Sequence, residues 1–198
     1  MPSPAPRLIV ATRNAHKTAE IRSMLGGRFE VVDATAFPEF PEIEETGTTF
    51  LENARLKAEG ISRLIDGWVL SDDSGLEVDA LGGAPGVWSS SYGGEEGNNE
   101  KNNARLMTEM AGKTERGGRF VCTMVLAKDG KERANFSGAV EGDIIDEPRG
   151  SEGFGYDPLF IPTGYDRTFS ELGDAVKNTL SHRSRALSQI TAWLDINF

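Results

Sequence analysis

The sequence has a single cysteine, Cys122, and two histidines among its 198 residues. One cysteine excludes an internal disulfide, which is typical of a protein from a reducing compartment, and no cysteine–histidine group has the spacing of a zinc site. No apolar run approaches the length of a membrane-spanning helix. Residues 1–6 lack the apolar core of a signal peptide, so we expect them to form a disordered leader on a cytoplasmic protein.

Positive charge is also scarce, because 21 lysines and arginines stand against 31 aspartates and glutamates. The formal net charge of -10 disfavours binding to a nucleic-acid backbone or a membrane surface. A small polyanionic ligand would need a local group of basic residues or a metal ion. The hydrophobic content of 38% is sufficient for one substantial core, so we predict a single domain over residues 1–198.

A short apolar stretch, residues 68–70, leads directly into two adjacent carboxylates, Asp72 and Asp73. Magnesium takes oxygen ligands in proteins, and one or two carboxylates are often enough to hold it. Neighbouring side chains of a strand point to opposite faces, so we expect the strand to end or bulge here, where Ser74 and Gly75 permit a break. The alternative is a solvated turn.

The N-terminal segment has the pattern of a strand, a short polar loop and a helix. Residues 7–12 are the expected strand, and the apolar positions of the following helix end at Gly26. Asn14 and Lys17 then lie at the beginning of this helix, where free N–H groups and the helix dipole attract anions. The alternative interpretation of Lys17 is an ordinary surface lysine.

An acidic loop containing Glu44 and Glu45 precedes the next predicted helix. Thr49 and Glu52 have the spacing of a capping box, which marks the beginning of that helix. Its apolar side chains follow steps of three and four residues. Lys57 lies off this stripe, so we interpret it as surface charge.

A hairpin is predicted in the second half of the chain. Residues 118–127 form a long strand that is apolar on both faces, which favours a central place in the sheet. The dipeptide Asp129-Gly130 indicates a tight turn, and the return strand continues to about residue 145.

A glycine-rich loop, residues 148–155, follows the hairpin. Ser170 is the expected N-cap of the next helix, and Ser181 is the expected N-cap of the last one. His182 and Arg183 then fall in a first helical turn, where positive charge is disfavoured by the helix dipole. Either a ligand or chance exposure explains this placement.

Six motifs follow one another along nearly the whole chain: ATRNAHK at 11–17, EETGTTF at 44–50, DDSGL at 72–76, GGAPG at 82–86, GFGYDP at 153–158 and SHR at 181–183. In this order they resemble the non-canonical purine NTP pyrophosphatases, the inosine triphosphatase or HAM1-like family. The resemblance implies an α/β fold with a long curved mixed sheet flanked by helices, and two lobes with a central nucleotide-binding cleft. It also implies a homodimer that uses Mg²⁺ to hydrolyse ITP, dITP and XTP to the monophosphate and pyrophosphate, which removes deaminated purines from the nucleotide pool.

The resemblance also assigns roles to individual residues. It places the catalytic carboxylate at Asp73, and the metal site at Glu44 and Asp73 with Glu45 as a further candidate. The substrate contacts belong to a phosphate loop and a base pocket: Thr12, Arg13, Asn14, Ala15, His16, Lys17, Ser74, Phe154, Gly155, Tyr156, Asp157, Lys177, His182 and Arg183. The chain departs from many relatives at Arg13, where they have glycine, and just before Lys177, where they have an acidic pair.

Two other functions remain as alternatives. The first is a pyrophosphatase for other modified nucleotides on a related fold, such as the Maf-like proteins, which the GFGYDP and SHR motifs disfavour. The second is a regulatory nucleotide-binding module without catalysis, which has no need of a water-activating carboxylate such as Asp73. A substrate panel and the release of pyrophosphate distinguish the three functions.

Overall fold

The structure is a computed structural model, and it describes residues 5–197. Within these residues, six strands form one sheet in the order β2-β1-β3-β4-β5-β6. The strands are β1 (Arg7–Val10), β2 (Glu30–Asp33), β3 (Trp68–Val78), β4 (Gly117–Lys128), β5 (Lys131–Ile144) and β6 (Phe160–Pro162). β1 pairs in parallel with β2 and β3, whereas β5 pairs antiparallel with β6, so the sheet is mixed as predicted.

Five α-helices accompany the sheet within the described residues: α1 (Ala15–Leu25), α2 (Phe50–Ser62), α3 (Asn99–Met110), α4 (Phe169–Leu180) and α5 (His182–Asn197). None of these helices has the length and apolar character needed to cross a membrane. The leader expected over residues 1–6 lies outside the described part of the chain at residues 1–4.

The chain divides into two compact units. Unit 1 comprises the chain up to Asp73, residues 123–137, and the chain from Arg185 onward. Unit 2 comprises residues 74–122 and 138–184. β3, β4, β5 and α5 each contribute residues to both units, so the boundary between the units falls inside regular elements.

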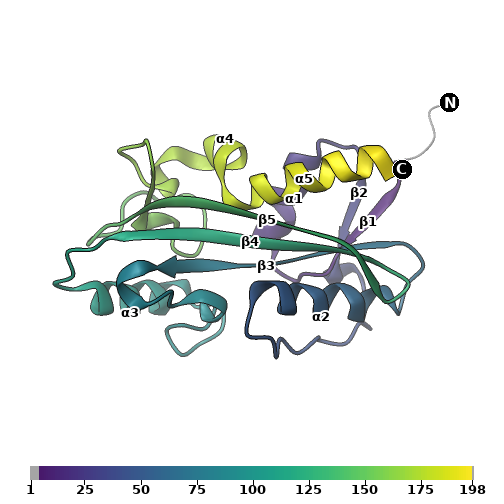
Figure 1. The fold of residues 1–198 in the computed structure, drawn as a ribbon, viewed down its shortest axis with the longest axis horizontal. Helices are drawn as coiled ribbons and strands as arrows, with labels where there is room; N and C mark the ends of the chain where they lie inside the picture. The colour runs from purple at the N-terminus through teal and green to yellow at the C-terminus, as the bar shows by residue number, and fades with distance from the viewer. Residues whose placement is uncertain (1–4, 198) are drawn as a thin grey trace. The chain divides into compact units, whose positions relative to one another are not determined.

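Unit 1 is built around β1 and the first half of β3. α2 covers one face of these strands, and α1 and α5 cover the other (Figure 1). Ile9 and Val69 of the strands are buried together with Ile61 of α2. The alanines Ala54 and Ala58 of α2 are fully buried in a second cluster, where their small side chains permit a close approach to the sheet.

Unit 2 contains the second half of β3 and most of the glycine-rich loops. α3 lies on one face of its strands and α4 on the other (Figure 1). The core includes an aromatic group in which the Phe120 ring lies 4.7 Å from that of Phe160 and 6.1 Å from that of Phe169. Such rings contribute both buried area and edge-to-face contacts.

Several local signals in the sequence were sufficient to place these elements. α1 ends at Gly26, which has the left-handed φ of 58°. The capping box of Thr49 and Glu52 is present at the beginning of α2. The turn between β4 and β5 has positive φ at both Asp129 and Gly130, as the hairpin signal predicts.

Two local predictions are wrong. β3 continues without a break from Trp68 to Val78, through both acids and the Ser74-Gly75 pair. The N-cap of α4 is Thr168, which forms a capping box with Glu171, and Ser170 instead donates to the Glu152 carbonyl at 2.5 Å. At α4, Thr168 offers the same capping chemistry two residues before Ser170, whose side chain binds elsewhere.

Candidate functional site

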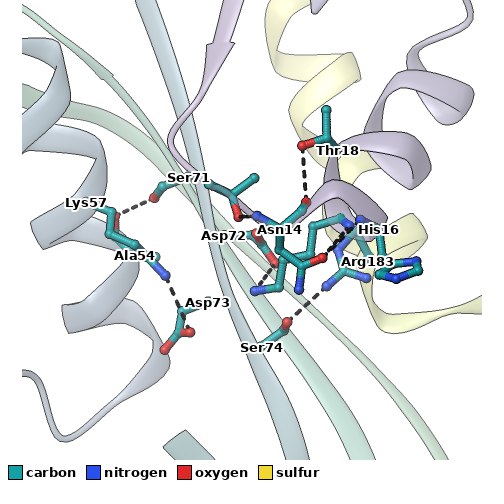
Figure 2. A network of polar contacts seen from close by, with 12 residues as sticks. Asn14, His16, Thr18, Ala54, Lys57, Ser71, Asp72, Asp73, Ser74 and Arg183 are labelled. Carbon is teal, nitrogen blue, oxygen red and sulfur yellow. Dashed lines mark hydrogen bonds and ion pairs between the residues drawn. The ribbon is translucent and has the colours of Figure 1, made fainter. Parts of the chain in front are cut away.

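The loop between β1 and α1 is held by its own polar groups. The Asn14 side chain accepts hydrogen bonds from the backbone N–H of His16 at 3.0 Å and of Lys17 at 3.3 Å, so it is the N-cap of α1 (Figure 2). The Asn14 N–H in turn donates to Thr12 Oγ1 at 3.1 Å. The predicted phosphate loop is therefore a fixed turn at a helix N-terminus, where an anion is favoured.

Arg13 extends from this loop towards backbone and not towards a carboxylate. Its Nη2 donates to the Phe40 carbonyl at 2.9 Å. The side chain thus ties the phosphate loop to the segment that precedes the acidic loop. Arginine in place of the glycine of many relatives is compatible with a compact turn here.

Asp72 is paired with Lys17 beneath this loop. The Lys17 ammonium lies 3.1 Å from Asp72 Oδ2, and the Asp72 side chain is 0% exposed. A fully buried carboxylate is stable only with a charged or hydrogen-bonding partner, so Asp72 fixes the position of the lysine ammonium.

Asp73 has a different lysine. Its Oδ1 lies 3.6 Å from the ammonium of Lys57, which reaches from α2 towards the strand (Figure 2). The same ammonium lies 3.0 Å from Glu45 Oε2. Because β3 is continuous, Asp72 and Asp73 point to opposite faces, one towards α1 and one towards α2.

Burial raises the pKa of Asp73 from 3.8 to about 6, although Lys57 and Lys17 oppose the shift. The residue is 8% exposed, and its Oδ2 is buried with no hydrogen-bond donor among residues 5–197. A base with a pKa just below neutral pH is charged in the cell and still basic enough to accept a proton. This combination favours Asp73 as a catalytic group.

Lys57 is the functional candidate that the sequence analysis missed. Burial opposes its charge, but Asp73 and Glu45 outweigh that effect and raise the pKa of the ammonium, which stays protonated. In the sequence, its position off the apolar stripe of α2 indicated only that it lies on the polar face of the helix. Its partners are distant in sequence, so only the residue type and the DDSG motif opposite could have identified it.

The same group of oxygens fits a hard divalent cation. Asp73 offers a buried oxygen with no donor from the described residues, and Glu45 is held near it by the shared Lys57. Glu44, the predicted metal ligand, and Glu45 are both exposed, and Glu45 is the one that contacts Lys57. Within residues 5–197, no three histidine, cysteine or carboxylate side chains are grouped so that they could hold a metal ion by themselves.

The predicted base pocket is a second group of residues, in unit 2. Asp157 Oδ2 accepts from the Phe154 N–H at 2.9 Å and from Lys177 Nζ at 2.6 Å. The Lys177 ammonium lies 4.5 Å from the centre of the Phe154 ring, and the Arg183 guanidinium lies 5.9 Å from it. An aromatic face with cations above it can bind a planar ring that carries oxygen acceptors.

Arg183 is 1% exposed, and it donates from Nη2 to Ser74 Oγ at 3.0 Å (Figure 2). His182 is buried beside it and stacks on Phe120 at 5.0 Å. Chance exposure therefore does not explain the basic pair. Ser181 Oγ accepts from the Ser184 N–H at 3.2 Å, as expected of the N-cap of α5.

Tyr156 binds a neighbouring loop through its hydroxyl. Its side chain is 3% exposed in the core of unit 2, and its hydroxyl donates to the Ser89 carbonyl at 2.7 Å. Burial raises the pKa of this phenol. Gly155, the preceding residue, has a φ of 63° and gives the turn its left-handed conformation.

The predicted site residues thus form two groups. The first group lies in unit 1 and contains Thr12, Arg13, Asn14, Ala15, His16, Lys17, Glu44, Glu45 and Asp73, and the structure adds Asp72 and Lys57 to it. The second, in unit 2, begins at Ser74 and includes the GFGYDP turn, Lys177, His182 and Arg183. Asp73 and Ser74 are consecutive in the chain, so one peptide bond joins the two groups.

The mixed sheet flanked by helices defines an α/β protein, and each of its two units holds a lysine paired with a carboxylate. The chain belongs to the Ham1 family, whose model matches residues 8–193.

Similar proteins cover nearly the whole chain. A Bacillus licheniformis protein named dITP/XTP pyrophosphatase is 46% identical over 191 residues, which cover 95% of this chain and 97% of that protein. A Geobacter sulfurreducens protein of the same name is 48% identical over 92% of this chain and 93% of its own length. The solved Ham1 protein of Staphylococcus aureus superposes with a TM-score of 0.87 at 34% identity, and covers 97% of this chain and 100% of that one.

Proposed function

We propose that this chain is a nucleoside triphosphate pyrophosphohydrolase acting on deaminated purine nucleotides, namely ITP, dITP and XTP. The products are the nucleoside monophosphate and pyrophosphate. The observation that carries the proposal is Asp73, a buried carboxylate with a pKa raised to about 6 beside two lysines. The names of the relatives, dITP/XTP pyrophosphatase, support the substrate class.

In the proposed reaction, water adds to phosphorus at the anhydride between the α- and β-phosphates, and the bond to the bridging oxygen breaks. Asp73 accepts the proton of that water, and pyrophosphate leaves with the bridging oxygen. Lys17 and Lys57 place positive charge where the phosphate oxygens gain negative charge. Asp72 holds Lys17 in position without reaching the reacting atoms.

A divalent metal suits this chemistry, and we propose Mg²⁺. Asp73 and Glu45 would hold it, since both supply oxygen ligands next to Lys57. When bound, the ion neutralises phosphate charge and favours attack on phosphorus. The lysines perform part of the same neutralisation with the chain's own residues.

The residues of unit 2 support the choice of base. Phe154 offers an apolar face for stacking a purine, and Lys177 and Arg183 are the cations nearest to that ring. Inosine and xanthine carry an oxygen at C6, where adenine carries an amino group. A cationic donor favours the oxygen and is mismatched to the amino group.

The test is a panel of nucleoside triphosphates with product identification. We expect ITP to give IMP and pyrophosphate in one step that requires Mg²⁺. Hydrolysis of other modified nucleotides in preference to ITP would favour the Maf-like alternative. Tight binding without product would favour a regulatory module, and IDP with orthophosphate would contradict the proposed bond cleavage.

The homodimer and the cytoplasmic location are part of the same proposal and are supported by the resemblance. Sedimentation equilibrium of the purified chain tests the dimer. A single molar mass of about 21.5 kDa at micromolar concentration would contradict it.

A further inference from the structure

Helix α3 carries two adjacent asparagines that hold two different loops of unit 2. Asn102 accepts from the Gly93 N–H at 2.6 Å and donates to the Ser90 carbonyl at 2.9 Å. Asn103 Nδ2 donates to the Gly155 carbonyl at 3.0 Å. Successive residues of a helix point in directions about 100° apart, so one short segment of α3 can bind both loops.

The loop that Asn103 holds is the GFGYDP turn of the proposed base pocket. Inside the turn, Asp157 binds the Phe154 N–H and the Lys177 ammonium. Outside it, Asn103 binds the carbonyl of Gly155. The backbone that presents the Phe154 ring is therefore fixed from both sides.

A further hydrogen bond links the turn, the Ser89–Ser90 loop and α3 into a closed ring of hydrogen bonds. The Tyr156 hydroxyl donates to the Ser89 carbonyl at 2.7 Å, and the next residue, Ser90, is the one that Asn102 holds. Ser89 Oγ accepts from the Leu76 N–H of β3 at 2.9 Å. The turn, the Ser89–Ser90 loop and α3 thus restrain one another, and movement of any one breaks a hydrogen bond at another.

The Asn103 amide has one orientation in this ring. Only its Nδ2 can donate to the Gly155 carbonyl, so Oδ1 must face the other way. Oδ1 is buried there, and no group of residues 5–197 donates to it. A buried acceptor without a donor lowers the stability of the folded protein. The orientation of the Asn103 amide is therefore better explained by the position in which it holds the turn than by a gain in stability.

We propose that Asn103 is a positioning residue for the base pocket of this protein. It holds the Gly155 carbonyl, and through it the Phe154 ring, in the place where the purine stacks. The inference rests on the proposed function. The lysines and carboxylates around Asp73 belong to unit 1 and share no hydrogen bond with Asn103, so loss of Asn103 should weaken base binding and leave the reaction at phosphorus unchanged.

The experiment compares two substrates, ITP and the base-free ribose 5-triphosphate. Asn103→Ala removes the donor, and we expect kcat/KM for ITP to fall about three- to tenfold, mainly through KM. Asn103→Asp places a carboxylate oxygen against the Gly155 carbonyl, so the fall should be larger. For ribose 5-triphosphate both variants should keep the wild-type kcat/KM.

Asn99→Asp is the matched control, because Asn99 is exposed on the same helix and undergoes the same chemical change. It should leave kcat/KM unchanged for both substrates. Tyr156→Phe is an independent variant that opens the ring at Ser89 without touching α3, and it should lower kcat/KM for ITP selectively as well.

An equal fall for both substrates, together with a lower melting temperature, would overturn the inference and make Asn103 a purely structural residue. Unchanged ITP kinetics in Asn103→Asp would also overturn it. Failure of the proposed function itself has a different signature, because the wild-type protein would then release no pyrophosphate from ITP.

Discussion

The ammonium of Lys57, on α2, lies 3.6 Å from Oδ1 of Asp73, on β3. An opposite charge at this distance normally lowers the pKa of a carboxylate. Here burial outweighs the lysine, and the pKa of Asp73 rises to about 6. The pair therefore combines a carboxylate that is still a useful base with a cation for the phosphate, and the following predictions depend on that balance.

Asp73→Asn should abolish most of the turnover. The amide keeps the shape of the side chain and removes both the negative charge and the basic oxygen. Loss of a general base commonly costs about 10²- to 10⁴-fold in rate. The measurement is kcat for ITP at saturating Mg²⁺, with circular dichroism as the control for folding. Near-normal turnover would assign the role of base to another carboxylate.

The same variant should be more stable than the wild-type protein at neutral pH. A raised pKa means that folding disfavours the charged form, so stability falls as pH rises between the unfolded pKa of 3.8 and the folded pKa of about 6. This shift corresponds to about 3 kcal/mol, which Asp73→Asn should regain. Urea unfolding in EDTA at pH 7.5 measures the gain, and the difference should shrink towards pH 4. Equal stability at both pH values would contradict the raised pKa.

The pH profile of the activity should fall on its acid side, where Asp73 becomes protonated. Because Asp73 must be deprotonated to accept a proton, kcat/KM for ITP should decrease below a pH of about 6. A bound cation favours the carboxylate, so higher Mg²⁺ should move this limb to lower pH. If the pH of this decrease did not depend on the Mg²⁺ concentration, the titrating group would not be a ligand of the metal.

Glu45 and Glu44 form a matched pair for the metal site. Both side chains are exposed, and Glu45 is the one that contacts Lys57 next to Asp73. Glu45→Gln should raise the Mg²⁺ concentration for half-maximal activity by about tenfold or more. Glu44→Gln should leave it unchanged. The reverse result would identify Glu44 as the metal ligand, as the sequence predicts.

Arg183 should determine the preference for an oxygen at C6. A hydrogen bond to a charged group is worth about 1.5–3 kcal/mol, or about 10- to 150-fold in binding. Arg183→Ala should lower kcat/KM for ITP by such a factor and for ATP much less. Arg183→Lys should recover only part, since lysine lacks the planar donor fork. An equal fall for both nucleotides would indicate that the buried guanidinium only supports Ser74 and the helix.

Local sequence signals predicted most of the elements because their causes are local. The capping box at Thr49, the left-handed stop at Gly26 and the turn at Asp129 each depend on residues within one turn. Ser170 failed as an N-cap because Thr168 offers the same chemistry two residues earlier, and tertiary contacts engage Ser170 with Glu152.

The site was harder to predict where the partner of a charged side chain comes from another element of the fold. The sequence indicated that Asp72 and Asp73 share one place only if the strand breaks, and the unbroken β3 sends them to Lys17 and Lys57 instead. No local pattern around Lys57 reveals a partner 16 residues further along the chain. The choice between Glu44 and Glu45 likewise depends on a contact made across the fold.

The division into two compact units has a consequence for the integrity of the chain. The backbone crosses the boundary at 73/74, 122/123, 137/138 and 184/185, and each crossing lies within β3, β4, β5 or α5. No single cut can therefore separate one unit from the other, and neither exists as a continuous piece of sequence. A protease should yield either the intact protein or small peptides, with no durable half-molecule between them.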